Sequence, residues 1–144
     1  MIRDDLPGLE LIDGDGDPRI PETPITGRGL QRLRWQRYEI ESYLVHPAPL
    51  ERFPEREADG DPEALRHYFA ENYPPAFMRD PLRDYPFLIG AKARTKLIPP
   101  ALDAAGVPGI PYTRYHEIAA LMQPEEIHPE VIDKLNAIQK AFGL

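Results

Sequence analysis

Three aspartates that follow a short apolar run are the residues of this chain best suited to do chemistry. The stretch from Leu9 to Asp17 reads Leu-Glu-Leu-Ile-Asp-Gly-Asp-Gly-Asp. Glycine has no Cβ and permits sharp turns, so Asp13, Asp15 and Asp17 can direct their carboxylates to one point. Crowded carboxylates repel one another, and a hard cation such as Mg²⁺, Mn²⁺ or Ca²⁺ relieves that repulsion. The alternative is a solvated Asp/Gly turn.

A calcium-binding EF-hand loop is the first metal site to compare with this pattern, because such a loop also opens with D-x-D-x-D. The EF-hand needs glycine at its sixth position and a bidentate glutamate at its twelfth. Here these positions are occupied by Pro18 and Pro24. An apolar strand is also expected before the aspartates, where an EF-hand has a helix. The sequence therefore disfavours a calcium loop.

A strand that ends in D-x-D is also typical of Mg²⁺-dependent phosphoryl-transfer sites, in which the carboxylates hold a metal that positions the attacking water. Such a site needs further carboxylates nearby in space. Glu39 and Glu41 lie among apolar residues downstream. On a helix Glu41 would be only partly free to face water, and a partly buried glutamate needs a cation or a hydrogen-bond donor.

Two blocks of the sequence carry a family resemblance. The run Leu-Ile-Asp-Gly-Asp ending at Asp15 is followed by a proline-rich loop and by Leu-Arg-Trp-Gln-Arg-Tyr-Glu-Ile-Glu-Ser-Tyr-Leu ending at Leu44. Together they resemble the TOPRIM segment of AAA-type ATPases of the overcoming-lysogenization-defect (OLD) nuclease family, which act in phage defence or DNA processing. The region from Tyr112 to Ile138 is similar to the helical tail of the same proteins.

The resemblance implies a site and a reaction. Asp13 and Asp15 would be metal ligands, and Glu41 would be the carboxylate of a second metal position. Two Mg²⁺ or Mn²⁺ ions would then support cleavage of a DNA phosphodiester. Lys92, in Gly-Ala-Lys, is the nearest counterpart of a lysine that stabilises charge in the transition state, and Lys96 is the alternative. A solvated basic face is the simpler interpretation of both lysines.

The chain also departs from the family pattern. Ser42 replaces the usual asparagine, and the upstream half of a TOPRIM domain, with its first strand and its glutamate, has no counterpart before Leu9. No Walker A glycine loop occurs. We therefore expect a fragment, a remnant, or a subunit that an ATPase or the missing TOPRIM half completes, with low or no activity alone. A non-catalytic helical interaction domain, in which the acidic turn is solvated and the last helix docks a partner, is the alternative function.

Composition narrows the class of protein. The chain has 144 residues, which is enough for one domain with a modest core. Its formal net charge of −7 excludes a global basic field for nucleic acid, so contact with DNA must be local or metal-mediated. Cysteine is absent, and no apolar run approaches the length of a membrane span. These features favour a cytoplasmic protein with no membrane segment.

The expected fold class is α/β and helix-rich: a partial TOPRIM-like domain with one or two short strands and a C-terminal helical tail. Residues 1–60 would carry the metal-site half and residues 61–144 the helical portion, packed together as a single domain. The strands are expected at the apolar run before Asp13 and at 30–35, with an exposed proline-rich loop at 18–29 between them. A short helix is expected at 38–45.

Local signals set the bounds of the later helices. Asp61-Pro62-Glu63 is a strong helix start, and that helix should end near Asn72 before two prolines. A helix is predicted at 87–98 and should be interrupted by Pro99 and Pro100. The last helix should begin near Pro129, end at Gly143, and bury a stripe made of Val131, Ile132, Leu135, Ile138 and Phe142.

Overall fold

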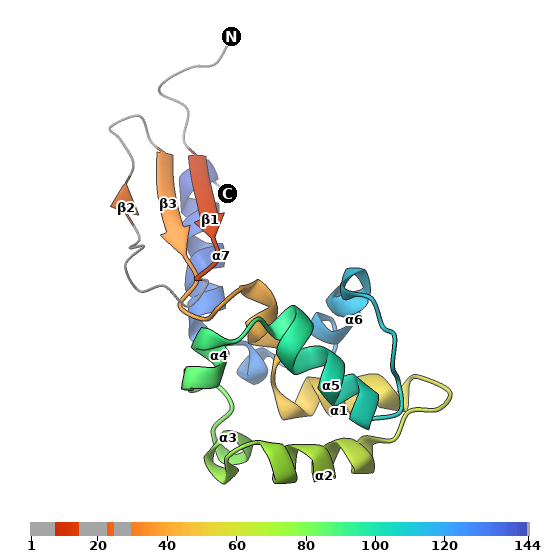
Figure 1. The fold of residues 1–144 in the computed structure, drawn as a ribbon. Coiled ribbons are helices and arrows are strands. Elements are labelled where there is room, and N and C mark those ends of the chain that lie inside the picture. The colour runs from red at the N-terminus through yellow and green to blue at the C-terminus, as the bar shows by residue number, and fades with distance from the viewer. Residues whose placement is uncertain (1–7, 15–22, 25–29, 144) are drawn as a thin grey trace.

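A computed structural model describes residues 8–14, 23–24 and 30–143 of the chain. Its strands form one small sheet in the order β1-β3-β2. Strand β1 (Gly8–Ile12) is parallel to β3 (Leu30–Arg34), and β2 (Thr23–Pro24) is antiparallel to β3. The arrows of β1 and β3 point toward the helical body, so their carboxyl ends meet at the junction of sheet and helices (Figure 1).

Short helical segments make up most of the rest of the chain. The first half contains η1 (Ile40–Leu44), α1 (Pro47–Glu55), α2 (Pro62–Asn72), α3 (Pro75–Arg79) and α4 (Pro86–Gly90). The second half contains η2 (Ala93–Leu97), α5 (Ile98–Ala104), η3 (Tyr112–Arg114), α6 (Tyr115–Ala119), η4 (Pro124–Glu126) and α7 (Pro129–Phe142). The protein is thus helix-rich, as the sequence predicted.

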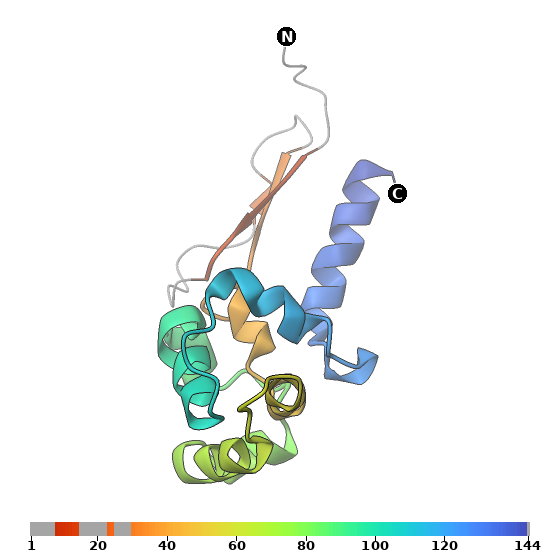
Figure 2. The ribbon, with the colours of Figure 1, turned by 90° about the vertical axis from the view of Figure 1, so that its right-hand side faces the viewer.

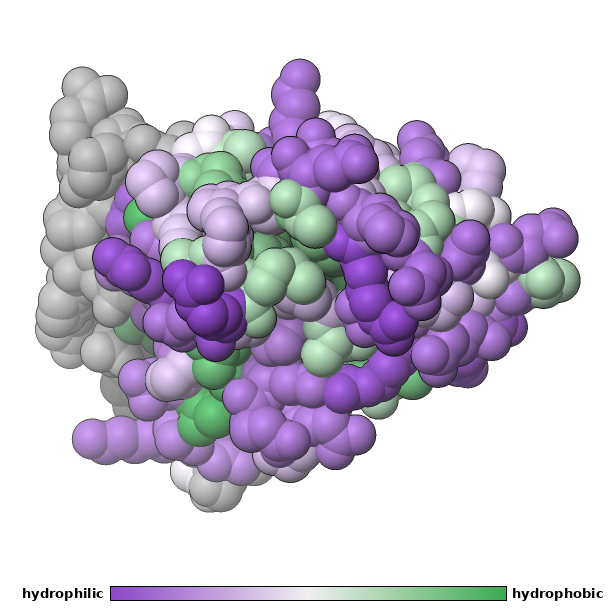
Figure 3. Space-filling model, turned by 90° about the horizontal axis from the view of Figure 1, so that it is seen from below, coloured by the Kyte–Doolittle hydropathy of each residue, from purple (hydrophilic) through white to green (hydrophobic). Residues whose placement is uncertain are grey.

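A hydrophobic core lies among the helices. One cluster of buried side chains joins η1, α1, α2, α3, α4, η2, α5 and α6, and its members include Val45, Leu50, Phe53, Leu65, Phe69, Phe77, Leu88, Ile98, Leu102 and Ile118. This cluster contains residues from both sides of position 60. Seen from the side of α2 and α3, the surface is mostly hydrophilic, with small scattered apolar areas (Figure 3).

Helix α7 runs beside one face of the sheet, where it contacts β1 (Figure 2). The sheet and α7 together project from the helical body. In the part of the chain that the structure describes, no helix is long and apolar enough to cross a membrane.

Several boundaries agree with the sequence signals. Strands β1 and β3 form where they were expected. Helix α2 begins with the Asp61 side chain accepting a hydrogen bond from the Ala64 N–H at 3.1 Å, and it ends at Asn72. Helix α7 starts at Pro129 and is closed by Gly143 in the left-handed conformation, with φ of 68°. Local capping chemistry was sufficient to define these ends.

Three other expectations are wrong. The predicted helix at 87–98 is divided into α4 and η2, with an extended residue, Ala91, after α4. Pro99 and Pro100 do not interrupt a helix, because they lie in the first turn of α5, where proline lacks only an N–H that would have no partner there. The segment at 18–29, predicted to be a loop, contains β2, so the sheet has three strands where one or two were expected.

The stripe predicted on α7 is also wrong in its burial. Ile132, Leu135 and Phe142 are 44%, 56% and 51% exposed. The buried side chain of this helix is Lys134, whose Nζ lies 5.9 Å from the centre of the Trp35 ring and 3.5 Å from Glu130 Oε2. The apolar periodicity of α7 correctly predicts a helix, but the apolar face that it predicts to be buried is largely exposed to solvent.

Candidate metal and nucleotide site

The end of β1 lies directly against the segment that connects β3 to η1. Gly14 follows Asp13 there, and a Cβ added to Gly14 would collide with the carbonyl oxygens of Trp35 and Arg37. Only glycine permits so close an approach. The parallel pairing of β1 and β3, with Ile12 opposite Arg34, brings these two segments to the same edge of the sheet. Asp13 is exposed at this edge.

Glu39 is the acidic residue at the centre of this junction. It is only 3% exposed, and its Oε1 accepts a hydrogen bond from the backbone N–H of Arg94 at 2.8 Å. Its own N–H donates to Ser42 Oγ at 3.2 Å, which fixes the start of η1. Burial raises the pKa of Glu39, and the negative charges of Glu41 and Asp13 raise it further, while the Arg94 N–H opposes the shift.

The same interactions show that three carboxylates from two distant segments lie within electrostatic range of one another. Asp13 and Glu41 both act on the pKa of Glu39. Glu41 is half-buried in η1 and also acts on the pKa of Tyr115, which burial raises. Carboxylate oxygens are the ligand type that Mg²⁺ and Mn²⁺ prefer, but these three carboxylates do not by themselves form a metal-binding group.

The remaining residues predicted to form the site are placed as follows. Asp15 lies outside the described residues. Lys92 is half-buried and precedes η2, where its carbonyl accepts hydrogen bonds from the N–H groups of Thr95 and Lys96. Lys96 is exposed. Within residues 8–14, 23–24 and 30–143, no three His, Cys, Asp or Glu side chains are positioned to hold a metal ion.

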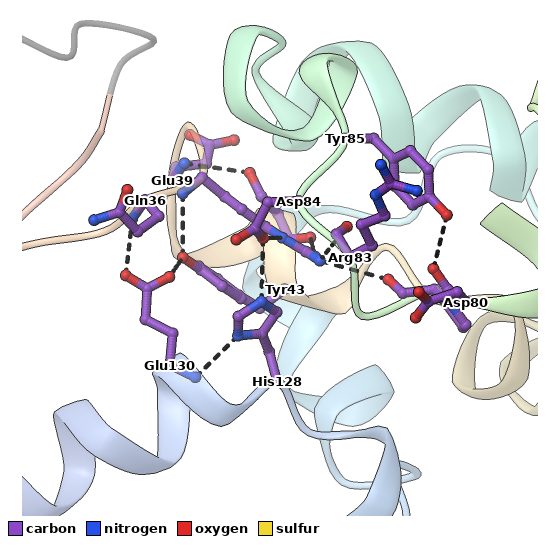
Figure 4. A network of polar contacts seen from close by, with 12 residues as sticks. Gln36, Glu39, Tyr43, Asp80, Arg83, Asp84, Tyr85, His128 and Glu130 are labelled. Atoms are coloured by element: carbon purple, nitrogen blue, oxygen red, sulfur yellow. Dashed lines mark hydrogen bonds and ion pairs between the residues drawn. The ribbon is translucent and has the colours of Figure 1, made fainter. Parts of the chain in front are cut away.

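A buried network holds the carboxylate-bearing segment against the rest of the molecule (Figure 4). Arg37 is 1% exposed, and its guanidinium donates to Asp84 Oδ1 at 2.9 Å. It also donates to the carbonyls of Ser42 and Arg83, each at 3.1 Å. A buried guanidinium requires this many acceptors, so Arg37 fixes the path of the chain between β3 and η1.

Tyr43 connects that network to α7. Its hydroxyl accepts from the Arg37 N–H at 3.1 Å and donates to Glu130 Oε1. The other Glu130 oxygen, Oε2, accepts from the Gln36 N–H at 2.9 Å. Burial raises the pKa of Tyr43, so this hydroxyl remains a donor at neutral pH. The side chain of His128, before α7, also contacts Asp84 Oδ1 at 3.1 Å.

The sequence placed Glu39 and Glu41 together as candidate carboxylates and assigned the ligand role to Glu41, but it did not predict that Glu39 is the buried one. One signal for the position of Glu39 was present in the sequence. Ser42 follows Glu39 by three residues, and this spacing is that of a capping box, here with the glutamate at the N-cap and the serine at the third helical position. Arg94 was also missed as the η2 residue that reaches the carboxylates. Its contact is made by the backbone, so no side-chain motif could have revealed it.

The chain matches no protein-family model, and comparison with curated proteins and with solved structures found no match. The resemblance to OLD-type TOPRIM segments therefore rests on the residues of this sequence alone.

Proposed function

We propose that the chain is a Mg²⁺- or Mn²⁺-dependent nuclease-like module that acts on phosphodiester bonds of DNA, similar to the TOPRIM part of OLD-type ATPase-nucleases. The observation that supports this most is the close approach of Gly14, the residue after Asp13, to the carbonyl oxygens of Trp35 and Arg37, which brings the end of β1 to the segment that leads to Glu39 and Glu41. Asp13 directly follows β1, Glu39 directly precedes η1 and Glu41 lies in η1, and these are the two segments that carry the acidic residues of the resemblance.

The roles within the site follow from exposure. Asp13 is exposed and Glu41 is half-buried, so both can offer oxygens to an ion, while Glu39 is held inward by its hydrogen bond from the Arg94 N–H. A bound Mg²⁺ or Mn²⁺ would supply a polarised phosphate and an activated water. We expect a further ligand from Asp15 or from a partner chain, either an ATPase subunit or another part of a TOPRIM domain.

Lys92 keeps its proposed role as a charge partner for the phosphate. It precedes η2, whose next residues include Arg94 and Lys96, so a short basic segment lies beside the acidic one. Local charge of this kind can hold a DNA phosphate despite the overall net charge of −7.

Nicking of supercoiled plasmid in Mn²⁺ tests the nuclease proposal. We expect slow nicking by the unmodified chain, none in excess chelator, and none by the Asp13→Ala, Asp15→Ala double variant. Asp103→Ala is the matched control, because Asp103 is an exposed aspartate on α5. A double variant that nicks as fast as the unmodified chain excludes a nuclease that uses these aspartates.

The exposed face of α7 favours a second candidate, a non-catalytic interaction domain. Ile132, Leu135 and Phe142 place apolar surface on one side of this helix, and an amphipathic helix of this kind can dock into an apolar groove. In this reading the acidic edge is solvated.

Sedimentation of the chain with and without Leu135→Glu tests this candidate. Asn136→Glu introduces the same charge at the neighbouring exposed position and serves as the control. Association that Leu135→Glu abolishes and Asn136→Glu preserves would support an interaction role. A chain that remains monomeric and binds Mn²⁺ would favour the nuclease-like module.

A further inference from the structure

A surface cavity opens beside the carboxylates of Asp13, Glu39 and Glu41. Its volume is about 310 Å³, and it lies where η1 faces η3 and α6. The side chains that line it include Ile40, Glu41, Leu44, Tyr112, Tyr115 and His116. Glu41 is therefore both a member of the carboxylate cluster and part of the cavity wall, so anything bound in the cavity would lie next to the proposed metal position.

The wall of this cavity is aromatic and open to solvent. Tyr112 is 56% exposed and Ile40 is 50% exposed, although both side chains are largely apolar. The guanidinium carbon of Arg94 lies 4.5 Å from the centre of the Tyr112 ring. Arg94 therefore lies over one face of the Tyr112 ring, and nucleic-acid bases can stack on a guanidinium plane as well as on an aromatic ring.

Positively charged side chains lie near the cavity, where they could contact the phosphates of a DNA strand. Arg94 belongs to η2, and Lys92 and Lys96 lie two residues on either side of it. A DNA strand whose base entered the cavity would carry its phosphates along this segment, at the edge that also bears Glu41. The basic segment complements the phosphates, and the aromatic wall complements the base.

We propose that this cavity receives an unpaired base and that the substrate of the acidic site is therefore single-stranded DNA. This inference rests on the proposed nuclease function. In duplex DNA the bases are stacked and paired, so a base could enter only after extrusion, which loses its stacking and pairing. An unpaired strand carries no such penalty, so the cavity selects for it.

Fluorescence anisotropy with a labelled single-stranded phosphorothioate oligonucleotide in Mn²⁺ tests the assignment, with the matching duplex measured alongside. Stacking on one aromatic ring contributes about 1–3 kcal/mol per base, so Tyr112→Ala should weaken single-strand binding roughly five- to hundredfold. Tyr112→Phe keeps the ring and should bind like the unmodified chain. Tyr68→Ala is the control, because Tyr68 lines a different cavity with Asn72 and Tyr73.

The inference is overturned if Tyr112→Ala binds the single strand as tightly as the unmodified chain, if duplex binds as tightly as single strand, or if no single strand binds. Loss of nicking in the Asp13→Ala, Asp15→Ala variant together with normal binding by Tyr112→Ala would overturn the cavity assignment and leave the nuclease function standing. Tyr112-dependent binding of single strands by a chain that never nicks DNA would leave the base site standing and overturn the nuclease function.

Discussion

The carboxylate of Glu39 accepts a hydrogen bond from the backbone N–H of Arg94 at 2.8 Å, and this contact joins the start of η1 to η2. A buried carboxylate with one such donor is only partly compensated for the loss of water. Burial, Glu41 and Asp13 accordingly hold its pKa above the usual range for glutamate.

Glu39→Gln should change how stability depends on pH in the absence of metal. Between the ordinary pKa of glutamate and the raised pKa of folded Glu39, the folded chain binds more protons than the unfolded chain, so its free energy of unfolding falls as pH rises. Glutamine removes this titration and can still accept from Arg94. Denaturant unfolding at several pH values above 4.5 should show a smaller decline for Glu39→Gln, and an unchanged decline would contradict the burial of a charged Glu39.

Gly14→Ala should weaken metal binding although it removes no carboxylate. The added methyl group would meet the carbonyls of Trp35 and Arg37, so the end of β1 would move away from η1 and carry Asp13 with it. We expect Mn²⁺ affinity to fall at least about tenfold, or about 1.4 kcal/mol, by calorimetry. Gly90→Ala is the control, because a Cβ there meets nothing within 4 Å. Equal affinities for the two variants would argue against this positioning role.

Tyr43→Phe should loosen α7 from the remainder of the molecule. Its hydroxyl satisfies both the Arg37 N–H and Glu130, and removing it leaves two polar groups without that partner. The expected loss is about 1–3 kcal/mol in the free energy of unfolding. The rate of amide hydrogen exchange should rise first in α7, because the Tyr43 hydroxyl contacts this helix through Glu130. The exposed Tyr112→Phe is the matched control, and comparable exchange in both variants would contradict the role of Tyr43.

Glu126→Gln should lower stability at neutral pH and lessen its loss in acid. Both oxygens of Glu126 accept from the Arg52 guanidinium, at 2.5 and 2.6 Å, and the same carboxylate accepts from the Gln123 N–H at 2.9 Å. The hydrogen bond from Arg52 is the main cause that lowers the pKa of Glu126. Its contribution is therefore present above the ordinary pKa of glutamate and is lost as pH falls through the lowered one.

Because Arg52 is partly exposed, we expect a loss of about 1–2 kcal/mol at neutral pH. Thermal unfolding at neutral pH and in acid measures both effects. Glu125→Gln is the control at the adjacent exposed position. The unmodified chain and Glu126→Gln could instead differ in stability by the same amount at every pH. That result would contradict a contribution of the Arg52–Glu126 ion pair that depends on protonation.

Local chemistry in the sequence defined several elements well. Asp61 followed by Pro62 marks the start of α2, and Pro129 and Gly143 mark both ends of α7, because capping and proline placement depend only on neighbouring residues. The strand before Asp13 was also evident from its apolar run.

Tertiary context decided what the sequence could not. The apolar face of α7 implied burial, but amphipathic spacing does not show whether another element covers that face, and Leu135 is exposed. The inward position of Glu39 depends on the backbone of Arg94, which is distant in sequence. The cavity between η1 and α6 likewise brings together Glu41 and Tyr112, which are separated by about half of the chain.

Titration of the chain with Mn²⁺ by isothermal calorimetry tests the central claim most directly, because it requires neither a substrate nor a partner. If Asp13 and Glu41 form one side of a metal site, the unmodified chain should bind with Kd below about 100 μM. An Asp13→Asn, Glu41→Gln double variant should bind at least about tenfold more weakly. No detectable binding by the unmodified chain, or equal binding by the double variant, would contradict a metal site at these carboxylates.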